Sequence, residues 1–337
     1  MSLNELWFVL IAVLFTGFFF LEGFDFGVGM ATRLLAKSDT DRRIMLNTIG
    51  PFWDANEVWL ITAAGAMLAA FPHWYATMFS GYYLLFALVL LALIGRGVAF
   101  EFRSKLEAPR WRRIWDGAIL IGSTAPPLLL GMALAGAAAG VPIGADMEMA
   151  AGWSDIVNVY TVLGGLTLTG LCLLHGLHFL ALRTTGELRE RSRRMALRWM
   201  PWQGALLAAF AVATWLSTDL FERRGLWLGL VLALGAAAYA LAAYWNRGGR
   251  EGLAFAMSGA TIALGCVALF AGLFPRVMVS SLDAAYDLTI YNAASGSYTL
   301  TAMTIVAACL LPFVLGYQAW SYVVFHKRLR PGDHLEY

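Results

Sequence analysis

The stretch FFFLEGFDFGVGM, residues Phe18 to Met30, decides the fold class. Apart from Glu22 and Asp25 it contains only apolar residues and glycine, and it lies within a longer apolar run over residues 6–31. About 20 apolar residues are enough to cross a bilayer as a helix. A carboxylate at that depth is costly unless it is paired, hydrated or protonated. The stretch therefore predicts a membrane helix whose two acids require specific partners.

The composition of the whole chain predicts a multi-span membrane protein. Hydrophobic residues make up 60% of the 337 positions and charged residues 14%, whereas soluble domains carry about 25% charge. The first apolar run has no basic leader and no A-x-A site, so we expect it to stay as a helix. We predict an all-α protein with nine spans at residues 6–31, 53–71, 75–102, 116–138, 156–183, 200–218, 226–245, 252–274 and 299–325.

Lysine and arginine are unequally divided between the two sides of these spans. Twenty lie in the loops after spans 1, 3, 5 and 7 and in the tail, whereas the opposite loops hold only Arg223, Arg224 and Arg276. Cytoplasmic loops carry the excess of positive charge. The N-terminus is therefore predicted outside and the C-terminus in the cytoplasm. The net charge of +2 and the lack of a basic stripe with interleaved aromatic residues give no reason to expect nucleic acid as a partner.

Five charged residues are predicted in the cytoplasmic half of the first three spans: Glu22, Asp25, Asp54, Glu57 and Arg96. The two acids of span 1 are three residues apart, as are those of span 2, so each pair shares a helix face. Gly23 and Gly27 form a small-xxx-small pair, so a neighbouring helix is expected to approach closely. Acids in a membrane are typical of proton relays. Two interpretations stay open: a proton path from the cytoplasm, and an ion pair that only holds helices together.

A short internal repeat connects the two halves of the sequence. LEGFDF (Leu21–Phe26) recurs as LHGLHF (Leu174–Phe179). Four spans separate the copies, so both have the same orientation, as in parallel membrane repeats. We predict two four-helix repeats, residues 1–138 and 150–275, and a last region, 276–337, with an external loop, a ninth helix and a short cytoplasmic tail.

Histidines replace the acids in the second copy, because His175 and His178 occupy the positions of Glu22 and Asp25. Imidazole is a common haem and metal ligand. Two histidines on one helix face cannot hold the two opposite axial positions of one haem, so we expect no iron ligand and no metal site in this chain. The cysteines lie far apart in apolar runs and suggest neither a disulfide nor a metal site: Cys172, Cys266 and Cys309.

Three motifs resemble subunit II of the cytochrome bd-type quinol oxidases, including their cyanide-insensitive variants. They are EGFDFGVGM (Glu22–Met30), DRRIMLNTIGPFWDANEVWLI (Asp41–Ile61) and GRGVAFEFRSK (Gly95–Lys105). The resemblance extends over essentially the whole chain, and its motifs are specific in the first 105 residues. It implies a bacterial inner-membrane heterodimer that oxidises quinol and reduces dioxygen to water. In that heterodimer this chain would be the subunit without haem ligands or catalytic residues, and haem b and haem d would belong to the larger subunit I.

The resemblance also implies a site and further partners. Carried over by motif, Asp25 and Asp54 are the main expected proton-path residues, with Glu22, Glu57 and Arg96 around them. Subunit II of this family can hold a lipid-like quinone in a groove, which the sequence does not locate. Membrane lipid and a small single-helix accessory subunit are further expected partners. From the residues alone, a proton-coupled secondary transporter stays an alternative, because parallel repeats and midplane acids suit it too.

Overall fold

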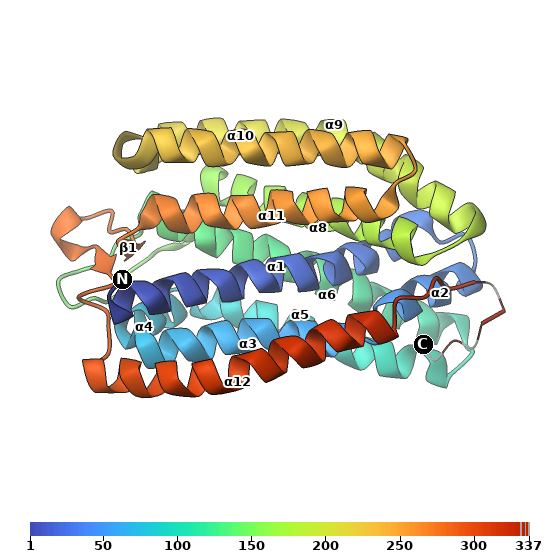
Figure 1. The fold of residues 1–337 in the computed structure, drawn as a ribbon, viewed down its shortest axis with the longest axis horizontal. Helices are drawn as coiled ribbons and strands as arrows, with labels where there is room; N and C mark the ends of the chain where they lie inside the picture. The colour runs from blue at the N-terminus through green and yellow to red at the C-terminus, as the bar shows by residue number, and fades with distance from the viewer. Residues whose placement is uncertain (331, 334, 336–337) are drawn as a thin grey trace.

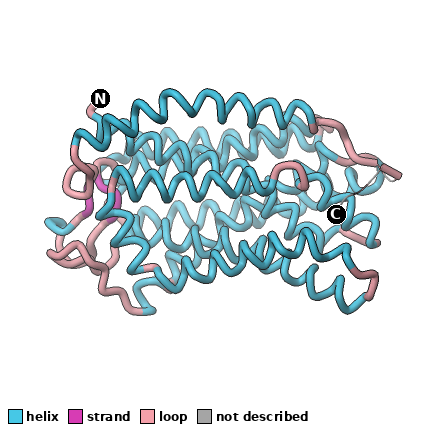
Figure 2. Tube along the Cα trace, turned by 90° about the horizontal axis from the view of Figure 1, so that it is seen from below, coloured by secondary structure: helices cyan, strands magenta, loops and turns pink. Residues whose placement is uncertain are grey.

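The structure, a computed structural model, describes residues 1–330, 332–333 and 335. Long helices run alongside one another, and the connecting segments gather at the two ends of the bundle (Figures 1 and 2). The helices are α1 (Leu3–Leu35), α2 (Asp39–Ile49), α3 (Trp53–Ala70), α4 (Pro72–Gly81), α5 (Tyr83–Phe102), α6 (Pro109–Ala139), α7 (Trp153–Ile156), α8 (Val159–Arg183), α9 (Gly186–Ser217), α10 (Leu220–Arg247), α11 (Glu251–Leu273) and α12 (Ser297–Val324). Two 3₁₀ turns, η1 (Arg103–Lys105) and η2 (Ala284–Tyr286), and two short antiparallel strands, β1 (Arg276–Met278) and β2 (Leu288–Thr289), complete the described elements.

Most residues of each predicted span are helical in the described chain, although the spans predicted at 75–102 and 156–183 each contain a break. Seven helices are long and apolar enough to cross a membrane: α1, α5, α6, α8, α10, α11 and α12. α3 and α9 run alongside them (Figure 1) but are more polar. α3 carries Asp54, Asn56 and Glu57 in its first turns, and α9 begins with an arginine-rich segment. The fold is therefore mainly helical, with seven candidate membrane helices.

Two predicted boundaries are wrong. The span predicted at 75–102 is two helices, because the chain leaves helical geometry at Tyr82 between α4 and α5. Met149 packs so closely on Gly81 that an added Cβ there would lie 2.3 Å from its sulfur. The segment 184–199, predicted as a loop, is helical from Gly186 onward and continuous with the following span. Arginine is a good helix former, so a basic segment can extend a helix beyond the membrane.

α1 is the central helix of the bundle and packs against α3, α6, α8 and α11. Its closest approach is to α8. An added Cβ at Gly27 would lie 2.0 Å from the carbonyl oxygen of Cys172 and 2.7 Å from the Cα of Gly176, whereas one at Gly23 would make ordinary contact with the Cys172 sulfur at 3.5 Å. The predicted close helix approach is therefore confirmed at Gly27, and the approaching helix is α8.

The basic segments meet at the end of the bundle that carries α2 and the C-terminus (Figure 1). There Asp39 binds Arg103 (2.6 Å) and Arg112 (3.0 Å), and Asp41 binds Arg191 (2.8 Å). These ion pairs connect α2 to η1, α6 and α9. We call this end the basic end; it comprises residues 33–43, 103–113, 183–198, 247–250 and 327–330.

The opposite end carries the N-terminus and the β1–β2 hairpin (Figures 1 and 2). Arg276 of β1 contacts Asp219 (2.6 Å) and Asp287 (3.4 Å). The amide of Ser295 donates to the carbonyl oxygen of Ala70 (2.9 Å). These contacts hold the long connection between α11 and α12 against the ends of α3 and α10.

Candidate functional site

Arg96 of α5 forms a buried ion pair in the first half of the chain. Its side chain is fully buried, as is that of Glu22 on α1, and its Nη1 donates to the Glu22 carboxylate. The rings of Phe26 and Phe100 lie 4.8 and 5.4 Å from the guanidinium carbon. On the α6 side, an added Cβ at Gly122 would lie 2.4 Å from the Cβ of Arg96. The pair is therefore enclosed by α1, α5 and α6.

Two further acids lie near this pair. Glu57 of α3 has Oε1 3.6 Å from Arg96 Nη1, and its side chain is 19% exposed. Asp25, three residues after Glu22 on α1, is fully buried. We call Glu22, Asp25, Glu57 and Arg96 the charge cluster. With one cation among three acids, the cluster carries excess negative charge when all are ionised, and an unpaired buried carboxylate is strongly unfavourable. Protons, water or hydrogen bonds must therefore offset that excess.

Several polar atoms of the charge cluster have no protein hydrogen-bond partner among the described residues. They are Glu22 Oε2, Asp25 Oδ1, Glu57 Oε1, Arg96 Nε and Arg96 Nη2. Buried polar atoms are nearly always satisfied by protein or water. Each of the three acids thus keeps one oxygen available for a proton or a water molecule.

The structure does not bury Asp54 with the other predicted acids. Asp54 is exposed in the first turn of α3, one turn before Glu57 on the same face. An acid at a helix N-terminus is stabilised by the free backbone amides there, so it needs no buried cation. Along α3 the acids therefore pass from exposed Asp54 to half-buried Glu57, and Arg96 follows in the interior.

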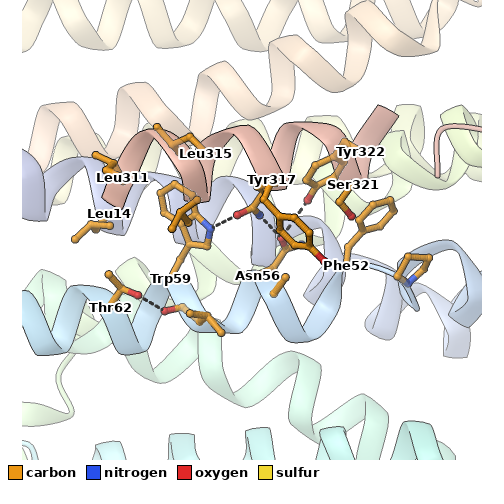
Figure 3. A pocket seen from close by; sticks show the side chains of 15 residues that line it. Leu14, Phe52, Asn56, Trp59, Thr62, Leu311, Leu315, Tyr317, Ser321 and Tyr322 are labelled. Atoms are coloured by element: carbon orange, nitrogen blue, oxygen red, sulfur yellow. Dashed lines mark hydrogen bonds between the residues drawn. The ribbon is translucent and has the colours of Figure 1, made fainter. Parts of the chain in front are cut away.

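The sequence analysis missed Asn56, which contacts the charge cluster directly. It is fully buried, and its Nδ2 donates to Asp25 Oδ2 at 2.7 Å. Its Oδ1 accepts from Gln318 Nε2 and Tyr322 Oη of α12, both at 3.1 Å (Figure 3). These residues line a cavity of about 260 Å³ between α3 and α12. The sequence contained one signal for Asn56: it is an uncharged polar residue that lies between Asp54 and Glu57 in a mostly apolar span.

The two histidines of α8 differ in their surroundings, although both are fully buried. His175 has Nδ1 2.8 Å from Ser258 Oγ and Nε2 3.1 Å from the carbonyl oxygen of Phe20, and its ring stacks on Phe255. Both its nitrogens are therefore engaged. Neither nitrogen of His178 has a protein partner in the described part of the chain. Among the described residues, no group of three His, Cys, Asp or Glu side chains could hold a metal ion.

Comparisons with known proteins identify the family. The family model for cytochrome bd terminal oxidase subunit II matches residues 3–325. The chain is 54% identical to cytochrome bd ubiquinol oxidase subunit 2 of Bacillus subtilis, covering 100% of this chain and 99% of that protein. It is 37% identical to cytochrome bd-I ubiquinol oxidase subunit 2 of Escherichia coli K12, with 98% and 96% covered.

A solved structure shows the same fold. A chain of the bd oxidase from Geobacillus thermodenitrificans superimposes with a TM-score of 0.77 at 17% identity, covering 96% of this chain and 99% of that chain. At that identity the likeness concerns the fold alone, whereas the family model and the sequence relatives cover nearly every residue. This chain belongs to the family of cytochrome bd terminal oxidase subunit II.

Proposed function

We propose that this chain conducts protons from the cytoplasm toward the haem-bearing subunit of a cytochrome bd oxidase and supports that subunit structurally. Members of the family are subunits of a quinol:oxygen oxidoreductase. The observation that carries the proposal is Glu57, an acid that is 19% exposed and lies 3.6 Å from Arg96 of a fully buried Arg96–Glu22 pair. Buried ionisable side chains in a membrane mark proton or ion pathways by default.

The path begins at the basic end and follows the acids inward. Asp54 is exposed, Glu57 lies one turn further along α3, and Arg96 connects Glu57 to Glu22. Asp25 lies on the same face of α1, three residues closer to the basic end than Glu22 and ten residues, or about 15 Å, before that helix ends at Leu35. Reduction of dioxygen consumes protons, and drawing them from the cytoplasm makes turnover build a membrane potential.

The proposal includes the topology predicted from the sequence: nine spans, an external N-terminus and a cytoplasmic C-terminus. Within this topology, residues 1–138 and 150–275 are repeats and 276–337 is the last region; positions 331, 334, 336 and 337 lie outside the described residues. Helix packing supports the repeat. α1 packs on α3 and α6 as α8 packs on α9 and α11, and α5 packs on α6 as α10 packs on α11. The single basic end supports the orientation, because cytoplasmic segments collect positive charge.

Haem b and haem d are assigned to subunit I, and none to this chain. His175 supports this assignment, because its two ring nitrogens already have partners.

An apolar cavity of about 190 Å³ lies among α6, α8, α9, α10 and α11, with Tyr160, Phe210 and Leu228 in its lining. It has the chemistry to hold the tail of a structural quinone or a lipid. The proposed location is the bacterial inner membrane, beside subunit I and a small single-helix accessory subunit. The family match over residues 3–325 favours the oxidase over a proton-coupled transporter.

Asparagine substitutions test the proton path. In the purified complex, Asp25→Asn and Asp54→Asn should leave the haem absorption spectrum unchanged and slow oxygen consumption by at least about tenfold, because a positioned proton-transfer group contributes that much or more. His178→Asn, a change on α8 outside the charge cluster, is the matched control and should keep turnover within about twofold. Normal turnover and normal proton coupling in both aspartate variants would reduce the charge cluster to a helix-packing device.

A further inference from the structure

We propose that Trp59, Gln318 and Tyr322 fix the direction of a hydrogen-bond chain that ends on Asp25, so that Asp25 carries its exchangeable proton on Oδ1 alone. The inference rests on the proposed proton path, because it assigns positioning residues to that path. It adds three residues, one on α3 and two on α12, none of which belongs to the charge cluster.

The chain starts at the indole of Trp59. An indole N–H donates and cannot accept a hydrogen bond. Trp59 Nε1 lies 2.9 Å from Gln318 Oε1, so that atom of Gln318 must be the carbonyl oxygen. The orientation of an amide side chain follows from its hydrogen-bond network. Here the network has a fixed starting point, and it turns the amide nitrogen of Gln318 toward α3.

The direction then passes to Asn56. Gln318 Nε2, which can only donate, lies 3.1 Å from Asn56 Oδ1, and the Tyr322 hydroxyl donates to the same oxygen at 3.1 Å (Figure 3). Two donors therefore hold the carbonyl oxygen of Asn56 toward α12. Its amide nitrogen points the opposite way, toward α1.

Asp25 receives the end of the chain. Asn56 Nδ2 donates to Asp25 Oδ2 at 2.7 Å and to the carbonyl oxygen of Leu21 at 3.4 Å. Both amide hydrogens are then used, and an amide nitrogen accepts none. The carbonyl oxygen of a neutral carboxyl group is a better acceptor than its hydroxyl oxygen, so this hydrogen bond favours an unprotonated Asp25 Oδ2 in both states of the acid. A proton on Asp25 is left with Oδ1, which has no protein partner among the described residues, and Glu22 is the neighbouring carboxyl group.

This arrangement gives α12 a specific role. Of its residues in the described chain only Leu300 is buried, so its polar contacts with α3 are few. The contacts of Trp59, Gln318 and Tyr322 instead connect α12 to α3 and, through Asn56, to Asp25. The polar residues that line the cavity between α3 and α12 therefore serve the orientation of Asp25.

Infrared difference spectroscopy of the whole oxidase complex tests the inference. The carbonyl band of protonated Asp25 is the band that Asp25→Asn removes. Asn56→Leu should move this band to higher frequency, because the carbonyl oxygen loses its donor. The double variant Gln318→Leu/Tyr322→Phe should split it in two, because Asn56 can then turn either way. Each single variant should keep one band, since the other donor still holds Asn56.

Turnover should follow the same pattern. The double variant should lose about threefold in oxygen consumption, and each single variant should stay within about 1.5-fold of the parent, as expected for partners within one network. Thr62→Val is the matched control: this hydroxyl lines the same cavity but bonds its own helix, at the carbonyl oxygen of Val58 (2.8 Å). The haem absorption spectrum measures how much of the oxidase complex is assembled, and the infrared carbonyl band is analysed for the assembled complex only.

Three results would overturn the inference: an unsplit band in the double variant, two bands in the parent protein, or no Asp25-dependent carbonyl band at any pH. These outcomes are separate from failure of the proton path. If Asp25→Asn keeps full turnover while the double variant splits the carbonyl band, the hydrogen-bond chain to Asp25 is supported and the proposed proton path is contradicted. If Asp25→Asn slows turnover and the carbonyl band of the double variant does not split, the proton path is supported and the hydrogen-bond chain is contradicted.

Discussion

The helices α1, α3, α5 and α6 and the helices α8, α9, α10 and α11 pack in similar patterns but differ in their buried polar groups. In the first set, Arg96, Glu22 and Asp25 are fully buried charges. In the second set, His175 is hydrogen-bonded to Ser258 and to the backbone of Phe20, and the described residues of this set form no ion pair in which both side chains are fully buried. Neutral side chains are therefore sufficient to hold this helix arrangement. The charges of the first set need a reason other than packing.

The amide side chains sharpen this contrast. Gln203 of α9 donates to the carbonyl oxygen of Thr167 on α8 at 3.0 Å, as Asn56 of α3 donates to that of Leu21 on α1 at 3.4 Å. Only Asn56 also reaches a carboxylate and accepts hydrogen bonds from α12. Asn56 thus connects α12 to the charge cluster of the first set, and Gln203 makes no corresponding connection in the second set.

Removing the cation should have the largest effect. Arg96→Ala leaves Glu22 buried without its partner, at a cost of about 3–5 kcal/mol, and we expect little assembled complex, measured as haem-containing oxidase per membrane protein. The double variant Arg96→Leu/Glu22→Leu removes both charges and should recover much of the assembly, because apolar replacement of a buried pair is often neutral. Normal assembly of Arg96→Ala would show that the pair is not needed for the first set to fold.

Disturbing the contact between the two sets should have the next largest effect. Gly27→Ala places a methyl group 2.0 Å from the carbonyl oxygen of Cys172, and overpacking of this kind costs about 1–3 kcal/mol. Gly23→Ala is the control, because its added Cβ would lie 3.5 Å from the nearest atom. Thermal unfolding of the purified complex should show a lower midpoint for Gly27→Ala only. Equal midpoints would mean that α1 and α8 can separate without loss.

The smallest effect is expected from the ion pair between Asp41 and Arg191, which connects α2 to α9. Burial opposes ionisation of Asp41, but hydrogen bonds and the charge of Arg191 outweigh it and lower the pKa of Asp41. A lowered pKa means that the stabilisation exists at neutral pH and is lost as the pH falls through and below about 3.9. Asp41→Asn should therefore cost at most about 1 kcal/mol at pH 7, and its deficit in unfolding midpoint should vanish in acid.

Asp39→Asn is the comparison for that variant, because the partners of Asp39, Arg103 and Arg112, both belong to the first part of the chain. Burial opposes ionisation of Asp39, but the hydrogen bond to Arg103 and the positive charges of Arg103, Arg112 and Arg42 together outweigh it, so the pKa of Asp39 is also lowered. If Asp41→Asn loosens the contact between the two sets and Asp39→Asn does not, hydrogen exchange should rise in α9 for the first variant alone. Equal exchange in both would show that Asp41 stabilises α2 only.

The sequence predicted that Arg96 pairs with one of the buried acids, and the structure shows that this acid is Glu22. A charge inside a membrane needs an opposite charge, and Arg96 is the only cation within the first three predicted spans, which hold the buried acids. The depth of Asp54 was not predictable in the same way. It depends on where α3 begins, and Trp53 as the first residue of that helix leaves Asp54 at the surface.

Other parts of the site were hidden from the sequence because they are uncharged. Gln318 and Tyr322 lie more than 260 positions from Asn56 along the chain, and nothing in an apolar helix marks which of its amides will meet another. The helical segment 186–199 was missed because arginines indicate a position outside the membrane and do not indicate whether the backbone there is helical. Periodicity and charge therefore predicted the spans and the ion pair, but not the hydrogen bonds between distant helices.

The central position of α1 has a consequence for biosynthesis. α1 leaves the ribosome first, whereas α8 and α11, which cover it, begin only at Val159 and Glu251. Asn56 and Arg96 emerge earlier, 31 residues after Asp25 and 74 residues after Glu22. The acids of the newly inserted helix therefore meet their partners while the second half of the chain is still being translated. We expect the Asn56–Asp25 hydrogen bond and then the Arg96–Glu22 ion pair to be the first lasting tertiary contacts of the nascent chain, and to hold α1 in the bilayer until α8 packs against Gly27.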